Sequence, residues 1–322
     1  MANVSTFLGQ NVHTLGQLPP NALKPLIDPS SSGLVTLRKR ARSKWYTTAI
    51  VGRLLYQNSP LHKYYQRAYY CNQELVQEGK KITGKFCDTR VCHVCNRIRT
   101  AKMMNGYISQ FRQFEYLEFV TLSVRSVFKN QLLPTIRQMR RAVTLIIRKL
   151  REKKKLELDG IIKLECTYNM IEDWFHPHIH ILVAGRVGKL IIQEWLKRFP
   201  DTAGIKGQDC READTDALNE IFKYQTKIIV GQKDKLTINI PALDTIMVAI
   251  KGMRTFQPFG RIRKVAEDVE GIQSQEYDGI KEYPFVTWVW EECDWVISNV
   301  TELGKETLTG YIPPDIEFTF IE

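Results

Sequence analysis

Three histidines alternate along one short apolar segment, and they are the residues of this chain best suited to chemistry. The chain holds 6 histidines in 322 residues, yet His176, His178 and His180 all fall in DWFHPHIHILVAG. Alternate residues of an extended strand face the same side. Two imidazoles on one strand face can chelate a divalent metal and leave positions open for a substrate. A lone strand histidine is usually structural, but this alternation predicts a metal site.

The other ligands of this site decide which metal chemistry it suits. No histidine follows His180 in the chain, which argues against most tri-histidine hydrolase sites. A carboxylate must then complete the set, and Glu165, on the partner strand of a predicted hairpin, is the natural candidate. Two imidazoles and one carboxylate suit Mn²⁺ or Mg²⁺, which would act as a Lewis acid on a phosphate oxygen.

A second set of reactive residues lies downstream at helical spacing. In NEIFKYQTKII, Glu220, Tyr224 and Lys227 fall at positions i, i+4 and i+7, on one face of a predicted helix. A tyrosine between a carboxylate and an ammonium could attack a metal-activated phosphodiester and form a phosphotyrosine bond. Lys227 could stabilise the developing charge. Without the histidines, a surface tyrosine beside an ion pair would be the default interpretation.

Four of the chain's 7 cysteines form a compact group with the spacing C-x15-C-x4-C-x2-C. The closing C-x2-C lets two thiolates grip one ion from a tight turn, and two more complete a tetrahedral structural zinc site. Reduced free thiols are the alternative, and His62 and His93 are alternative ligands. The remaining cysteines are interpreted as small core residues. The four predicted zinc ligands are Cys71, Cys87, Cys92 and Cys95.

The net charge of +11 favours a polyanionic partner, most simply nucleic acid, because each phosphate neutralised by Lys or Arg releases counterions. A charge that only keeps the protein soluble is the alternative. No apolar segment approaches the roughly 20 residues needed to span a bilayer. The N-terminus also lacks the pattern of a signal peptide. We therefore expect neither a membrane protein nor a secreted one.

The elements that position these residues predict an α+β fold with helices packed on a sheet. The helix begun by Pro134 carries many arginines, which form either a solvated face or a phosphate-facing one. The other predicted elements are a strand at 115–126, a hairpin of 160–169 and 175–185 with its turn near 170–173, helices at 188–198 and 214–230, and strands at 235–240 and 285–290. Four regions are expected: an N-terminal arm and helical region (1–70), a cysteine module (71–110), a catalytic domain (111–265) and a C-terminal extension (266–322).

Taken together, these motifs resemble the HUH endonuclease superfamily, and most closely its Rep_1-type rolling-circle replication initiators of small plasmids. HIHILV matches the H-U-H-U-U-U pattern, where U is bulky and apolar, and the preceding HP matches the Rep_1 form HPHxH. EFVTLSV is similar to the first motif of the family and KYQTK to its tyrosine motif. FCDTRVCHVCNRIR resembles the family's knuckle, with His93 in place of the usual proline. KGMRTFQPFGRIRK resembles its late GxR…G segment.

The resemblance implies a central antiparallel sheet that carries His178 and His180 as metal ligands, with Tyr224 as nucleophile on an adjacent helix. It also implies site-specific nicking of single-stranded or cruciform origin DNA through a 5′-phosphotyrosyl link. Glu220 matches the glutamate that activates water to end a replication round in some members. No Walker motif is present, so the resemblance implies a host helicase, together with a host replication polymerase, and a cytoplasmic site in a prokaryotic host.

Two other functions fit the same residues. A transposase or a mobilisation relaxase would use identical chemistry on other DNA ends. A non-catalytic, zinc-containing DNA-binding protein would use the histidines only structurally. The single tyrosine and the cysteine knuckle favour the replication initiator.

Overall fold

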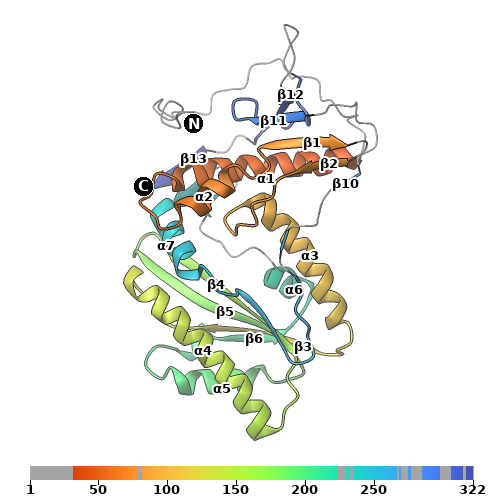
Figure 1. Ribbon diagram of the computed structural model, residues 1–322. Coiled ribbons are helices and arrows are strands. Elements are labelled where there is room, and N and C mark those ends of the chain that lie inside the picture. Colours follow the sequence, from red (N-terminus) through yellow and green to blue (C-terminus); the bar gives the residue numbers. More distant parts are fainter. Residues whose placement is uncertain are drawn as a thin grey trace.

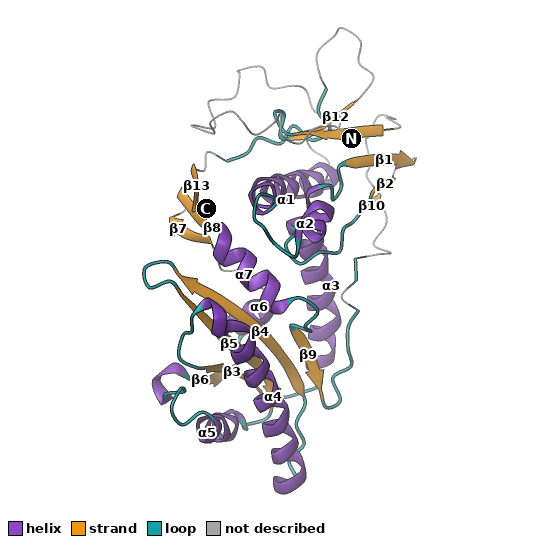
Figure 2. Cartoon of the chain, turned by 60° about the vertical axis from the view of Figure 1, so that its left-hand side comes forward, coloured by secondary structure: helices purple, strands orange, loops and turns teal. Residues whose placement is uncertain are grey.

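A computed structural model of the chain describes residues 32–78, 81–222, 229–232, 235–266, 268–269, 275–276, 285–297, 306–314 and 317–321. Residues 1–31, at the start of the predicted N-terminal region (1–70), therefore lie outside the described residues. One end of the molecule holds the N-terminal helices and the strands that surround them, and the other end holds the central sheet (Figures 1 and 2). None of the helices in these ranges combines the length and apolarity required to cross a membrane.

The central sheet has five strands in the order β6-β3-β5-β4-β9, and every neighbouring pair is antiparallel. The bounds are β3 (Leu117–Ser123), β4 (Gly160–Asn169), β5 (Trp174–Ala184), β6 (Asp209–Glu212) and β9 (Phe256–Phe259). The β4–β5 hairpin confirms the predicted strands and their turn, and β3 confirms the strand within 115–126. The α+β class with an antiparallel sheet is therefore confirmed.

Alternation along the strands gives this sheet two different faces. Leu164 and Ile179 belong to a core that includes residues of α4, α5 and α7. Ile161 and Leu182 belong to a smaller core with α3 and α6. His180 lies an even number of residues from Leu182, so the histidines share the α3 and α6 side. The helix bounds are α3 (His93–Phe111), α4 (Lys129–Lys154), α5 (Gly188–Arg198), α6 (Thr215–Phe222) and α7 (Ile240–Ile250).

A second five-stranded sheet, in the order β10-β2-β1-β11-β12, joins segments far apart in sequence. Strand β11 pairs with β1, so the C-terminal extension completes the sheet that flanks the cysteines. Trp45 of α1 packs in one core with Trp288 and Trp295. The domain boundaries at 70, 110 and 265 stay predictions. The bounds are α1 (Ser32–Leu54), α2 (His62–Tyr69), β1 (Glu74–Glu78), β2 (Lys81–Gly84), β10 (Gln275–Glu276), β11 (Phe285–Val289) and β12 (Asp294–Ile297).

A buried carboxylate organises the C-terminal part of this unit. Asp294 is 0% exposed and accepts hydrogen bonds from the backbone N–H and the hydroxyl of Thr309 at 2.8 and 2.9 Å. It also accepts one from the backbone N–H of Trp295 at 2.8 Å. Burial raises the pKa of Asp294 to about 6, even though these hydrogen bonds oppose the shift. A smaller sheet has the order β13-β8-β7, with β7 (Ile229–Gln232), β8 (Lys235–Asn239) and β13 (Glu317–Ile321).

Two helix boundaries differ from the prediction. Helix α4 begins at Lys129, before Pro134. The N–H that Pro134 lacks would have bonded to the carbonyl of Asn130. Asn130 is exposed in the first turn of the helix, so the loss of this hydrogen bond costs little there. The helix predicted at 214–230 ends at Phe222 in the described residues, and Ile229 begins strand β7. The β-branched run of Ile228, Ile229 and Val230 favours a strand at this position.

Candidate metal centre and cysteine cluster

The register of β4 and β5 places a carboxylate and two imidazoles on one sheet face. Glu165 pairs with His178, and Lys163 pairs with His180. Glu165 Oε2 lies 3.2 Å from His178 Nε2 and 3.5 Å from His180 Nε2. One possible ligand atom from each of Glu165, His178 and His180 lies within 4.8 Å of the other two, and all three residues are buried. The three side chains predicted as ligands from sequence are therefore brought together.

The orientation of the two imidazoles fits a metal between them. His178 Nδ1 lies 3.0 Å from the carbonyl oxygen of His176, which can only accept, so Nδ1 carries the proton and Nε2 is free to ligate. His180 Nδ1 contacts Thr121 Oγ1 at 3.0 Å. His180 Nε2 is buried and has no hydrogen-bond partner among the described residues. A metal ion would satisfy this buried atom, and such support of the second ring nitrogen is typical of metal-ligating histidines.

Lys163 fixes the other end of the carboxylate. Its side chain is 0% exposed and forms an ion pair with Glu165 Oε1, which leaves Oε2 facing the histidines. Burial alone would raise the pKa of Glu165, but the neighbouring His178 and His180 rings and the charge of Lys163 hold it well below its usual range. Glu165 is therefore an anion at neutral pH, as a metal ligand requires.

Lys163 also connects this group to the segment that leads to the predicted nucleophile. Its Nζ donates a hydrogen bond of 2.8 Å to the backbone carbonyl of Glu220, near the end of α6. Asp214 Oδ1 accepts from the N–H of Ala217 at 2.7 Å and caps the start of that helix. Tyr224 and Lys227 lie outside the described residues. The sheet thus contacts α6 four residues before Tyr224 along the sequence.

His176 stands beside the metal-binding group without belonging to it. Its ring packs on that of His178 with centroids 5.5 Å apart, and its Nδ1 lies 3.3 Å from Ser126 Oγ. Burial and the neighbouring His178 lower the pKa of His176. It is the backbone carbonyl of His176 that orients His178, so this residue supports a ligand from outside the group.

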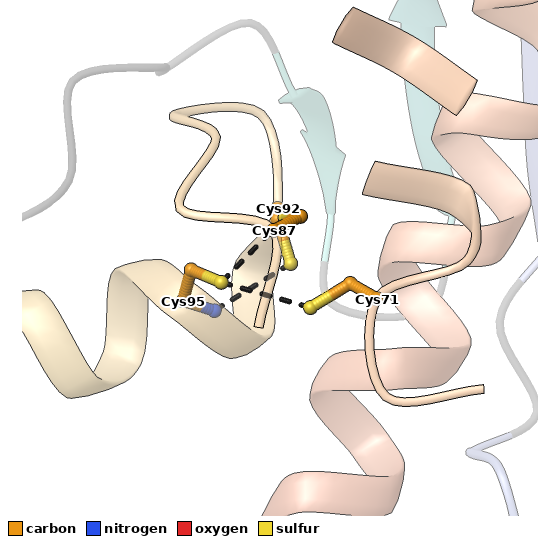
Figure 3. Close-up of side chains that lie close together, drawn as sticks. All are labelled: Cys71, Cys87, Cys92 and Cys95. Atoms are coloured by element: carbon orange, nitrogen blue, oxygen red, sulfur yellow. Dashed lines mark hydrogen bonds between the residues drawn. The ribbon is translucent and has the colours of Figure 1, made fainter. Parts of the chain in front are cut away.

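The four clustered cysteines converge at the start of α3 (Figure 3). Cys95 Sγ lies 3.6 Å from both Cys71 Sγ and Cys87 Sγ, too far for a disulfide. A tetrahedral site with metal–sulfur bonds of about 2.3 Å places its sulfurs about 3.8 Å apart. Cys92 caps α3, where its sulfur accepts from the backbone N–H of Cys95. The thiols are thus arranged as a metal-binding group.

The pKa values of the four thiols shift in opposite directions. Hydrogen bonds from Cys87, Cys92 and Cys95 lower the pKa of Cys71, and the pKa of Cys87 is also lowered. Burial raises the pKa of Cys92, and hydrogen bonding to Cys71 raises that of Cys95. The fully buried Lys44 stands nearby; burial lowers its pKa to about 8, against the opposing pull of the cysteine charges. The cysteine group that could hold a metal ion includes neither His62 nor His93.

Sequence reasoning missed Lys163 and Thr121, which hold the ligands in place. A signal for Lys163 was present, because it stands two residues before Glu165 in GIIKLEC and therefore shares its strand face. Thr121 gave no such signal. Its position opposite His180 depends on the pairing of β3 with β5, which joins residues far apart in sequence.

Comparison with known proteins places the chain in a family. The family model described as "Replication protein" (Rep_1) matches residues 79–188, which contain the Glu165, His178 and His180 group. "Protein rep" of Staphylococcus aureus is 30% identical over 176 residues, which cover 47% of this chain and 74% of that protein. "Protein rep" of Bacillus sp is 32% identical over 209 residues, covering 51% and 67% respectively.

"Protein rep" of Bacillus amyloliquefaciens is 35% identical over 214 residues, covering 52% of this chain and 62% of that protein. No solved structure matches. The chain belongs to the Rep_1 family of replication proteins, which confirms the resemblance drawn from its motifs.

Proposed function

We propose that this protein initiates rolling-circle replication as a site-specific, metal-dependent single-strand DNA endonuclease and strand transferase with an HUH-type catalytic domain. The observation that carries the proposal is the convergence of Glu165, His178 and His180 on one buried sheet face. Membership of a replication protein family supports DNA as the partner. The same membership favours a replication initiator over a transposase or a relaxase.

In this proposal Glu165, His178 and His180 would hold a divalent ion, and Mn²⁺ or Mg²⁺ would supply Lewis-acid chemistry at the scissile phosphate. His178 and His180 present their Nε2 atoms, and Lys163 keeps Glu165 ionised and oriented. The Tyr224 oxygen attacks phosphorus and loses its proton. The bond from phosphorus to the 3′ oxygen breaks, and that oxygen takes up a proton. The products are a 5′-phosphotyrosyl link and a free 3′-hydroxyl.

Two further residues have proposed roles in the reaction. Lys227 stabilises the negative charge that develops on the phosphate. Glu220 activates the water that releases the enzyme at the end of a round. The hydrogen bond from Lys163 to the Glu220 backbone supports a position of α6 close to the metal-binding group.

The cysteine cluster is proposed to hold a structural Zn²⁺ through Cys71, Cys87, Cys92 and Cys95. The sulfur separations and the burial support this role. Four thiolates would fill the tetrahedral coordination of zinc and leave no position for a substrate, so the ion would serve folding rather than chemistry. In the proposed cycle the substrate is single-stranded or cruciform origin DNA, and a helicase and a polymerase of the host continue replication.

The proposal is tested by the covalent adduct. The full-length protein, mixed with single-stranded origin DNA and Mn²⁺, should give a protein–DNA complex that survives SDS, and Tyr224→Phe should abolish it. Tyr56→Phe removes a hydroxyl from a 57% exposed tyrosine just after α1 and should leave the adduct unchanged. If the adduct persists in Tyr224→Phe, the nucleophile is another residue. A protein that binds DNA without forming an adduct would be the non-catalytic DNA-binding protein.

A further inference from the structure

A pocket with two arginines lies on the side of the central sheet away from the histidines. Helix α4 covers this face, and Arg140 from α4 and Arg254 from the loop before β9 both line the pocket. The floor includes Leu164 and Ile179, which face away from the metal-binding group. The pocket is therefore separate from the site described above.

Among the described residues, no carboxylate balances the charges of this pocket. Neither Arg140 nor Arg254 pairs with a carboxylate within the described part of the chain, and none of the residues that line the pocket is acidic. Burial lowers the pKa of Arg140, and the charge of Arg254 lowers it further. Two like charges that line one pocket, the half-buried Arg140 and the exposed Arg254, favour the binding of an anion between them.

The rest of the pocket supplies neutral hydrogen-bond donors. The hydroxyl of Thr255 and the side-chain amide of Gln257 line it, whereas the Thr144 hydroxyl already donates to the backbone carbonyl of Arg140 at 3.0 Å. Arg90 from the cysteine segment also donates to the Thr255 hydroxyl, so arginines from three separate segments meet around this residue. Guanidinium groups pair bidentately with phosphate oxygens, and hydroxyl and amide donors complete such contacts. The donor set therefore matches a phosphate group.

We propose that Arg140 and Arg254 together bind one backbone phosphate of DNA. The contact positions the DNA along the α4 side and β9 edge of the sheet, away from the scissile phosphate, and carries no sequence information. It goes beyond the proposed nicking reaction, because it requires only that DNA is the partner. The net charge of +11 attracts DNA at long range, and this pocket binds one of its phosphates at a defined position.

The test is the salt dependence of DNA binding. Affinity for a fluorescein-labelled duplex of mixed sequence is measured by anisotropy across a series of salt concentrations, without added Mn²⁺. Binding weakens as salt rises, and each phosphate neutralised by the protein makes the plot of log K against log salt steeper by about 0.9. Arg140→Gln and Arg254→Gln should each reduce the magnitude of this slope by about one and weaken binding about tenfold. The double variant should lose little more than either single one, because both residues hold the same phosphate.

Two further variants make the result specific. Arg198→Gln removes an exposed charge at the end of α5 and should leave the slope nearly unchanged. Arg140→Lys retains the charge, so it should keep the slope but lose part of the affinity with the bidentate contact. The phosphate site is overturned if Arg140→Gln and Arg254→Gln change the slope no more than Arg198→Gln does, or if their effects simply add.

The adduct assay separates this proposal from the nicking reaction. Arg140→Gln should still form a Tyr224-dependent adduct on a short single strand with Mn²⁺. A lowered salt slope without any adduct in the unsubstituted protein would overturn the proposed function alone. A normal adduct with an unchanged slope would overturn the phosphate site alone.

Discussion

Glu165 and His178 stand directly opposite each other on strands β4 and β5, with Glu165 Oε2 3.2 Å from His178 Nε2. His180, two residues further along β5, brings its own Nε2 to 3.5 Å from the same oxygen. One carboxylate oxygen thus faces both imidazoles, while Lys163 engages the other oxygen. The register of the hairpin therefore brings three candidate ligand atoms together, and contacts such as that of Lys163 orient them.

The three alternating histidines should differ in their effect on metal binding. His178→Ala removes a ligand atom and should weaken Mn²⁺ binding at least about 100-fold. His176→Ala keeps the backbone carbonyl that orients His178, so it should change the affinity only a few-fold. Isothermal titration with Mn²⁺ measures both. Equal losses in the two variants would contradict the assignment of His178 and His180 as the histidine ligands.

The cysteine cluster should control the stability of the N-terminal part. Cys87→Ser should abolish the stoichiometric zinc measured by mass spectrometry and lower the melting temperature, because metal binding contributes directly to folding. Cys210→Ser, at a half-buried cysteine outside the cluster, should retain the zinc and the melting temperature. Retention of zinc by Cys87→Ser would exclude Cys87 from the ligand set.

The sequence was informative where the chemistry is local in the chain. The alternation of histidines and the hairpin register predicted the group of Glu165, His178 and His180, because adjacent antiparallel strands joined by a short turn have few possible registers. The close C-x2-C spacing likewise located the cysteine cluster. Both results follow from residue spacings that are visible within a single segment of the sequence.

The parts that could not be predicted depend on contacts between distant segments. The pairing of β1 with β11 joins residues more than 200 positions apart, and no local pattern encodes it. Pro134 suggested a helix start because proline is favoured in a first turn. Helix α4 instead begins five residues earlier, at Lys129, and buries Leu132 ahead of the proline. The strand at Ile229 is a different case, because it pairs with β8, the next strand in the sequence, and this local hairpin takes the place of the end of the predicted helix.

Asp294 should make stability depend on pH in the direction opposite to most carboxylates. Its pKa is raised from 3.8 to about 6, so the folded chain binds more protons than the unfolded chain between these values. The free energy of unfolding should therefore fall as pH rises from about 4 to above 6, by up to about 3 kcal/mol. Urea unfolding at each pH should show this fall in the unsubstituted protein. Asp294→Asn should remove it, and a parallel fall in that variant would assign the effect to other groups.

The buried pair of Lys163 and Glu165 should be strongly coupled. Lys163→Met leaves Glu165 as a buried anion without its ammonium partner and should lower the free energy of unfolding by about 3 kcal/mol. Glu165→Gln leaves Lys163 uncompensated and should cost a similar amount. The double variant should cost less than the sum by about 1 kcal/mol or more, since it removes both charges together.

The matched control for these Lys163 and Glu165 variants is Lys149→Met. Lys149 also forms an ion pair, with Glu194, but its side chain is 39% exposed, so its loss should cost less than about 1 kcal/mol. Urea unfolding of all four variants gives the comparison. If Lys163→Met costs no more than Lys149→Met, Lys163 does not hold Glu165 in place. A large cost together with weakened Mn²⁺ binding would link the stability of the hairpin to the geometry of its metal-binding group.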